Sequence, residues 1–360
     1  MKRRQFLYAT AAGAIVVAVG KRSLAQTANQ TPPAINAKLA NGGDTTLEGG
    51  ALQDLRDRLH GRLLLPQDSG YEEARRVVIR RFDKRPACIV QATGPADVRY
   101  AVDFARENRL LLAVKGGGHS ELGVSTCDGG MMIDLSPMRS VRVDARAKRA
   151  WVSGGSLSGL VDHETFAQGL AVPMGDRATV GIGGLATGGG FGRISRRFGL
   201  TLDAIRSVDI VTADGNLVHA SDTDNPDLFW AVRGGGGNFG VVTTFELQLY
   251  PMQSRVIGGT VVFPYSQARQ VLSAYADYTA AAPDELYVDC FIDIGNSIGE
   301  STLNLGVCYS GSEADADRVL QPIERFGQVL RNDIATIGYL ALQGSDKQPE
   351  AATRLPSRIS

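Results

Sequence analysis

The sequence predicts an α+β protein made of two parts that differ in glycine content. In the first part, glycines gather in three clusters, at residues 116–118, 181–192 and 234–240, each next to an apolar run. From about residue 255 these clusters stop, and strand-like runs alternate with amphipathic helices. Discrete glycine clusters between apolar runs are typical of ligand-binding loops in a globular protein. A chain of 360 residues with 43% hydrophobic content can bury one large core or two moderate ones.

The N-terminus has the pattern of an export signal. A twin-arginine head in residues 1–7 precedes a run of small apolar residues at 9–19, and a small-x-small cleavage site ends at Ala25. We therefore expect residues 1–25 to be a twin-arginine signal peptide and the protein to be exported, to the periplasm or beyond. The apolar run is short for a bilayer span, so a membrane anchor is the weaker alternative. Residues 26–50, rich in polar residues, proline and glycine, are predicted to be a solvated linker.

Charge and cysteine usage exclude some classes of function. The chain has 38 basic and 38 acidic residues, so a nucleic-acid partner attracted by bulk charge is not expected. The cysteines show no CxxC spacing and no histidines at metal-ligand spacing, so no metal site is predicted. An exported protein can form disulfides, but the sequence does not give their connectivity. The four cysteines are Cys88, Cys127, Cys290 and Cys308.

The first part begins with a helix and a strand–helix–strand unit. Leucines at helical spacing predict a helix over residues 52–64. Residues 85–91 are predicted to form the first core strand, 95–108 a helix and 110–114 the next strand. The first glycine cluster therefore follows the carboxyl end of a strand, where α/β proteins commonly bind ligands.

Further strands and helices continue to the end of the second part. In the first part we expect strands at 131–135, 150–153, 205–213 and 217–220, and helices at 156–169 and 224–232. A tight turn at Asp214-Gly215 joins two of these strands into a hairpin. In the second part we expect strands at 256–263, 286–294 and 301–309, and helices at 266–281 and 313–326. Ser312 is a suitable N-cap for the last helix.

The run Lys115-Gly116-Gly117-Gly118-His119-Ser120 carries the clearest chemistry. Glycines allow a backbone to approach a ligand closely, and successive free N–H groups form a nest that suits a pyrophosphate. The histidine beyond the nest supplies a nucleophilic imidazole. The pattern favours a dinucleotide that is held by the backbone and bonded through its ring; an ordinary turn with a solvated histidine is the alternative.

Two more glycine-rich motifs extend this pattern to a family. They are the run Thr179-Val180-Gly181-Ile182-Gly183-Gly184, and residues 233–240 followed by a strand-like segment at 241–245. With them, the chain resembles the FAD-binding domain of the vanillyl-alcohol oxidase and p-cresol methylhydroxylase superfamily, and within it the berberine bridge enzyme-like branch. The resemblance is dense over residues 77–252 and weaker to about residue 339.

The resemblance implies a domain organisation. It predicts a two-subdomain FAD-binding domain of the p-cresol methylhydroxylase type over residues 51–252 and an incomplete antiparallel-sheet substrate domain over 253–343. In related enzymes the chain then returns to the FAD domain with a segment that carries a catalytic tyrosine or acidic residue. Residues 344–360 are polar, aperiodic and unlike that segment. The sequence therefore favours an irregular tail and a C-terminally truncated member, without identifying a catalytic residue.

The resemblance also implies which residues contact the cofactor. His119 occupies the position from which the family forms an 8α-N-histidyl bond to FAD, with Lys115–Ser120 around it. Many relatives form a second bond through a cysteine, but Arg177 stands there and cannot form a thioether, so a single link is expected. The contacts expected along the ribityl–pyrophosphate region and at the adenine end are Thr179, Gly181, Gly184 and Val242.

These features predict an FAD-dependent oxidoreductase, an oxidase or dehydrogenase that removes hydride from an alcohol, sugar or amine and passes electrons to oxygen or another acceptor. A non-catalytic FAD-binding remnant is the alternative from another class. A nicotinamide-dependent dehydrogenase is less favoured, because the G-x-G at 181–183 follows a loop at 173–177, where the Rossmann fingerprint requires a strand. The spacing of Tyr287, Tyr309 and Tyr339 singles out none of them as a catalytic group.

Overall fold

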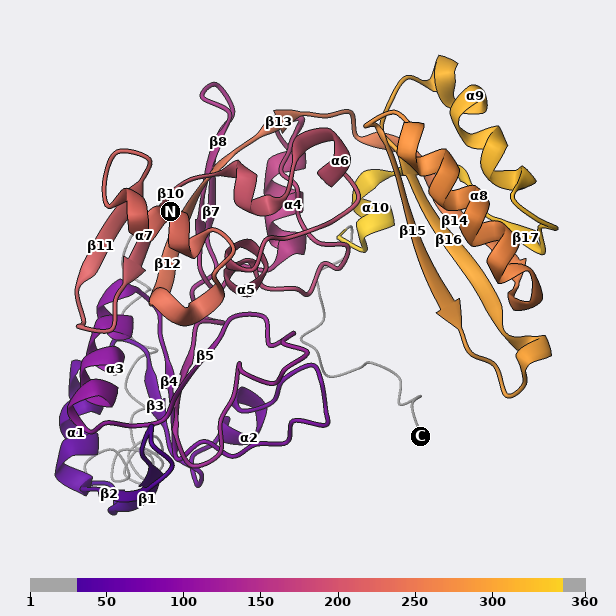
Figure 1. Ribbon diagram of the computed structural model, residues 1–360. Helices are drawn as coiled ribbons and strands as arrows, with labels where there is room; N and C mark the ends of the chain where they lie inside the picture. Colours follow the sequence, from indigo (N-terminus) through magenta and orange to yellow (C-terminus); the bar gives the residue numbers. More distant parts are fainter. Residues whose placement is uncertain (1–30, 346–360) are drawn as a thin grey trace, which may run out of the picture.

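The computed structural model describes residues 31–345, which form three sheets of four or five strands with helices packed around them (Figure 1). The predicted signal peptide, the start of the predicted linker and residues 346–360 lie outside the described residues. Within residues 31–345, no helix has the length and apolar character needed to cross a bilayer.

A β-hairpin occupies most of the segment predicted to be a linker. Strand β1 (Ile35–Lys38) pairs antiparallel with β2 (Asp44–Leu47), and the Lys38 N–H donates to the Gly129 carbonyl at 2.7 Å. Ala37 and Leu47 are buried in the first hydrophobic core. The linker prediction is therefore wrong from residue 35 onward, because a polar composition concealed two short strands that each bury one apolar side chain.

The first large sheet has the strand order β3-β4-β6-β5. Its strands are β3 (Arg62–Leu64), β4 (Cys88–Gln91), β5 (Leu112–Lys115) and β6 (Met131–Asp134), and its helices are α1 (Gly49–Arg58), α2 (Tyr71–Ala74) and α3 (Pro95–Glu107). Strands β4 and β5 run parallel to β6, which confirms the predicted strand–helix–strand unit. The helix predicted over 52–64 ends at Arg58. It ends there because the chain at Gly61 lies against β4: a Cβ on Gly61 would come within 1.9 Å of the Gln91 carbonyl oxygen.

The second sheet is antiparallel, with the order β11-β10-β12-β8-β7. Its strands are β7 (Val141–Asp144), β8 (Arg149–Ser153), β10 (Ile205–Val211), β11 (Leu217–Ser221) and β12 (Val241–Gln248). Around them lie α4 (Ser158–Phe166), α5 (Ile182–Thr187), α6 (Ser195–Phe198), α7 (Pro226–Val232) and the short pair β9 (Leu170–Ala171) and β13 (Tyr250–Pro251). The predicted hairpin at Asp214-Gly215 is confirmed, since β10 and β11 pair directly. Helix α5 begins directly after Gly181, within the second glycine cluster.

The third sheet, with the order β15-β16-β14-β17, is antiparallel as predicted for the second part. Its elements are β14 (Arg255–Pro264), α8 (Ala268–Ala281), β15 (Leu286–Asp293), β16 (Thr302–Tyr309), α9 (Ala316–Leu320), β17 (Arg331–Asn332), β18 (Ala335–Gly338) and α10 (Tyr339–Gln343). Helices α8 and α9 cover the side of the sheet that faces away from the glycine-rich part (Figure 1).

The last predicted helix, over 313–326, is broken into shorter pieces. Ser312 caps it as expected, with its Oγ accepting from the Ala314 N–H at 3.2 Å. The α-helical piece then stops at Leu320, and a 3₁₀ turn over Gln321–Arg325 follows. Pro322 explains the break, because its ring removes a backbone donor and clashes with the preceding turn.

Helix α10 brings the chain back to the glycine-rich part. The Tyr339 ring stacks on Phe166 of α4 with centroids 5.0 Å apart, and Gln343 Nε2 donates to the Gly175 carbonyl at 2.8 Å. Ser345 Oγ donates to a carboxylate oxygen of Asp162 at 3.0 Å. The segment predicted to be an irregular tail therefore begins packed against α4, because Ser345 is buried there.

Candidate functional site

Two glycine turns from distant parts of the chain meet face to face. Strand β5 ends at Lys115 and leads directly into Gly116–Gly118, where Gly118 takes a left-handed conformation with φ of +71°. A Cβ on Gly117 would lie 2.2 Å from the backbone nitrogen of Gly181, and a Cβ on Gly181 would lie 2.2 Å from that of Gly117. Neither position can carry a side chain without moving backbone, so the contact depends on both glycines.

His119 lies beside this contact and is held by the second turn. Its Nε2 is 3.0 Å from Thr179 Oγ1, which is 60 residues away in the sequence. Burial lowers the pKa of His119, and the positive charge of Arg177 lowers it further. A lowered pKa keeps the imidazole neutral at neutral pH, and the neutral form is the nucleophilic one. Arg177 is exposed, and its positive charge acts on His119.

A cavity of about 660 Å³ opens next to the first glycine turn. Four of the site residues predicted from the sequence line it, namely Lys115, Gly116, Gly117 and Thr179. Its walls carry five basic side chains and three acidic ones, so the cavity has an excess of positive charge. The basic side chains besides Lys115 are Arg62, Arg76, Arg80 and Arg139.

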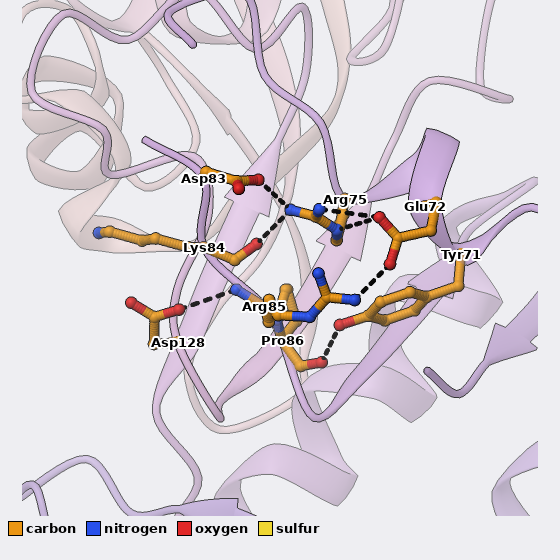
Figure 2. A network of polar contacts seen from close by, with 8 residues as sticks. All are labelled: Tyr71, Glu72, Arg75, Asp83, Lys84, Arg85, Pro86 and Asp128. Carbon is orange, nitrogen blue, oxygen red and sulfur yellow. Dashed lines mark hydrogen bonds and ion pairs between the residues drawn. The ribbon is translucent and has the colours of Figure 1, made fainter. Parts of the chain in front are cut away.

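The segment 71–86, which forms one wall of the cavity, is fixed by a network centred on Arg75 (Figure 2). The buried Arg75 guanidinium bonds to Glu72 at 2.8 Å, to Asp83 at 2.5 Å and to the Lys84 carbonyl at 3.2 Å. Tyr71 is fully buried as the first residue of α2, and its hydroxyl donates to the Pro86 carbonyl at 2.6 Å.

Two further contacts complete this network and explain what it does. Glu72 also accepts a hydrogen bond from Arg85, and the Arg85 N–H donates to Asp128 at 2.8 Å (Figure 2). A buried arginine with two carboxylate partners holds its loop in one conformation, because removing a partner would leave a buried charge unpaired. The network thereby positions Arg76 and Arg80 along the cavity wall.

Lys115 is buried and paired within the sheet. Its Nζ lies 3.3 Å from Asp134 Oδ2 and also donates to the Ala74 carbonyl. The register of β5 on β6 places Lys115 directly beside Asp134, so the parallel sheet itself creates the pair. This lysine ties α2 to the sheet edge at the cavity.

Other predicted site residues lie outside the cavity lining. Ser120 Oγ accepts from the Val124 N–H at 3.3 Å and so closes its own turn. Gly184 lies in the first turn of α5, and Val242 is buried in the core of the second sheet. The structure therefore brings the first glycine turn, His119, Thr179 and Gly181 together, but not Gly184 and Val242 with the cavity.

The arginines of the cavity were not predicted from the sequence. A signal was present, because arginines and lysines crowd residues 75–85, immediately before the first core strand. A run of charged residues usually lies on a solvated surface. Only the folded structure places part of this run beside the first glycine turn. Among the described residues, no three His, Cys, Asp or Glu side chains cluster as metal ligands would.

Comparisons with known proteins agree on one family. A family model described as an FAD binding domain matches residues 86–221. The chain is 33% identical over 283 residues to (R)-6-hydroxynicotine oxidase of Paenarthrobacter nicotinovorans, covering 78% of this chain and 62% of the relative. The crystal structure of 6-hydroxy-D-nicotine oxidase from Arthrobacter nicotinovorans matches with a TM-score of 0.76 and 32% identity, over 81% of this chain and 65% of that one.

A carbohydrate oxidase shows the same likeness. Glucooligosaccharide oxidase from Acremonium strictum, described as carrying 6-S-cysteinyl, 8α-N1-histidyl FAD, matches with a TM-score of 0.73 and 27% identity, over 82% of this chain and 62% of that one. The chain thus spans less than two thirds of the length of these three proteins.

Proposed function

The chain belongs to the vanillyl-alcohol oxidase and p-cresol methylhydroxylase superfamily of FAD-linked oxidoreductases, and on that basis we propose that it oxidises a small-molecule amine or carbohydrate. The observation that carries the proposal is the meeting of the two glycine turns beside His119 and a basic cavity. When bound, FAD accepts two electrons from the substrate and passes them to oxygen or another acceptor.

The residues present fit a dinucleotide. The contact between Gly117 and Gly181 leaves backbone without side chains beside the cavity, and backbone N–H groups in such turns bind phosphate oxygens. The excess of basic side chains in the cavity suits the negative charge of a diphosphate, and arginine forks match phosphate oxygens in pairs. Lys115, Gly116, Gly117 and Thr179 would hold the cofactor here.

His119 is suited to a covalent link. A neutral imidazole whose Nε2 is oriented by Thr179 can act as a nucleophile toward the cofactor ring. Arg177 cannot form the thioether through which related enzymes make a second bond, so we propose a single link. The glucooligosaccharide oxidase described with two links differs from this chain in that respect.

Replacing His119 with alanine is expected to convert a permanently yellow protein into one that loses its colour on acid precipitation. The wild-type protein should retain the yellow pigment in the precipitate, and intact-mass analysis should show one added FAD. The matched control is His163→Ala, because His163 is exposed on α4 and should leave the link intact.

The same preparations test the activity. Anaerobic addition of 6-hydroxynicotine or of cellobiose should bleach the flavin of the wild-type protein. Full FAD occupancy without bleaching by any amine or oligosaccharide would favour the non-catalytic alternative. A colourless wild-type protein with no added mass would contradict FAD binding altogether.

We also propose that the protein is exported by the twin-arginine route, on the strength of residues 1–25. Cell fractionation is expected to find the wild-type protein outside the cytoplasm and the Arg3→Lys/Arg4→Lys double variant inside it. The same distribution for both would overturn this proposal.

A further inference from the structure

The side chain of Gln343, on α10, reaches from the third sheet into the glycine-rich part. Helix α10 contacts α4 of that part and β14 and β18 of the third sheet (Figure 1). Gln343 is 2% exposed, and its Nε2 donates to the Gly175 carbonyl at 2.8 Å. Its Oε1 accepts from Arg193 Nη1. The network fixes this orientation of the amide, because the reverse one would set donor against donor and acceptor against acceptor.

Arg193 holds the next residue of the same loop. Its Nη1 also donates to the Asp176 carbonyl at 3.0 Å, so one connected pair of side chains binds two successive backbone carbonyls. Gly175 is buried, and a buried carbonyl that loses its donor pays the full cost of desolvation. The backbone at Gly175 and Asp176 is therefore held in one position. We call Gln343 and Arg193 the clamp.

The loop 175–179 leads from the clamp to the predicted attachment residue. It ends at Thr179, whose Oγ1 lies 3.0 Å from His119 Nε2. Burial lowers the pKa of His119 most, the charge of Arg177 lowers it further, and Glu121 acts in the opposite direction. With Nε2 bonded to Thr179, Nδ1 is the nitrogen left free to attack a ligand. The loop therefore sets both the orientation and the charge state of the imidazole.

Hydrogen bonds from the start of α4 hold the other end of the loop. The Gly159 N–H donates to the Ala178 carbonyl at 2.9 Å, and the Ser158 N–H donates to the Val180 carbonyl at 2.8 Å. The loop is thus held from two sides, by the clamp at its beginning and by α4 at its end. Loss of the clamp would let residues 175–177 move and would leave the end of the loop held from one side only.

We propose that the clamp positions the loop 175–179 for the covalent attachment of FAD at His119. This inference rests on the proposed function. During attachment, one N–C bond replaces the imidazole N–H bond and one C–H bond of the flavin 8-methyl group. The two electrons and two protons that are released reduce oxygen, the oxidant, to hydrogen peroxide. Gln343 and Arg193 take part in no bond change; they are positioning residues that act through the loop.

Two variants of Gln343 that nearly keep the size of the side chain test the clamp. Gln343→Glu keeps an acceptor for Arg193 but sets a second acceptor against the Gly175 carbonyl, and Gln343→Met removes both hydrogen bonds. Proteins prepared free of flavin, from riboflavin-starved cells, are incubated in air with excess FAD. Both variants are expected to gain acid-stable flavin about 10- to 100-fold more slowly than the wild type.

The total amount of bound FAD separates positioning from general damage to the fold. Lys115, Gly116 and Gly117, which line the cavity, do not contact the clamp, so FAD bound before acid treatment should stay close to the wild-type amount in both variants. A fall in bound FAD that equals the fall in attached FAD would show a merely structural role and would overturn the inference.

Gln270→Met is the control. Gln270 lies on α8, on the far side of the third sheet, and its Nε2 donates to the Phe326 carbonyl at 2.9 Å. The variant removes the same kind of hydrogen bond from the same part of the chain, away from the loop. Its rate of FAD attachment should lie within about twofold of the wild-type rate. Wild-type attachment rates in both Gln343 variants would contradict the inference.

A second readout needs no cofactor. The chain has four histidines, so the NMR signals of the His119 ring in flavin-free protein can be assigned by comparison with His119→Ala. In both Gln343 variants the pKa of His119 should move up toward its usual value, because Arg177 is no longer held beside the imidazole. An unchanged pKa in both variants would overturn the inference. If the wild type attaches no FAD, the proposed covalent link fails, and this titration still decides whether the clamp acts on His119.

Discussion

Gly117→Ala is expected to produce a protein that holds little or no FAD. The added methyl group would lie 2.2 Å from the Gly181 backbone nitrogen and 3.1 Å from the Thr179 carbonyl oxygen. These neighbours are backbone atoms, so no side chain can rotate to make room, and the two turns must separate. Overpacking of this kind costs about 1–3 kcal/mol. Separation of the turns also moves Thr179 away from His119.

The measurement is the ratio of flavin to protein absorbance after purification, together with the thermal midpoint. A cost in the lower part of that energy range disfavours the arrangement in which the two turns meet, and with it FAD loading, by roughly tenfold. Gly181→Ala should have the same effect, since the clash is reciprocal. Gly50→Ala is the control, because Gly50 lies in α1 with open space around its Cα. Full flavin content in Gly117→Ala would show that the two turns do not cooperate in binding.

The predictions that held are those in which local sequence determines local structure. An apolar run that ends in three glycines predicted a strand followed by a turn, and β5 followed by Gly116–Gly118 is that arrangement. A helix over 95–108 was expected from its apolar spacing, and α3 occupies almost the same residues. In both cases the signal lies within a dozen neighbouring residues.

The features that were missed depend on contacts between distant residues. Three features form only after the sheets have assembled. They are the hydrogen bond between His119 and Thr179, the contact of Gly117 with Gly181, and the group of arginines that line the cavity. Tyr287 could not be separated from other tyrosines by spacing. In the structure the Tyr287 hydroxyl donates to Asp289 Oδ2 at 3.2 Å, and the residue beside Asp289 on β16 is Gly306, where a Cβ would meet that carboxylate.

Replacing the buried Asp162 with asparagine is expected to have the second large effect, on the stability of the folded protein. Asp162 lies on α4, where one carboxylate oxygen accepts from Ser345 and the other has no partner among the described residues. Burial raises the pKa of Asp162 to about 7, while the hydrogen bond from Ser345 and the charge of Arg193 act in the opposite direction. The folded protein therefore binds this proton more tightly than the unfolded chain, in which an aspartate titrates near pH ~4.

The sign of the pH effect follows from that difference. Stability is full below about pH 4, where both states are protonated, and it falls as the pH rises toward 7, because the unfolded chain ionises freely and the folded one does not. Asp162→Asn keeps the size of the side chain and removes the ionisation. At pH 8 the variant should be more stable than wild type by up to about 4 kcal/mol, from roughly three pKa units, while at pH 4 the two should be similar. Thermal midpoints measured from pH 4 to pH 8 check this expectation, and parallel profiles for the two proteins would show that Asp162 is not the buried acid that limits stability at high pH.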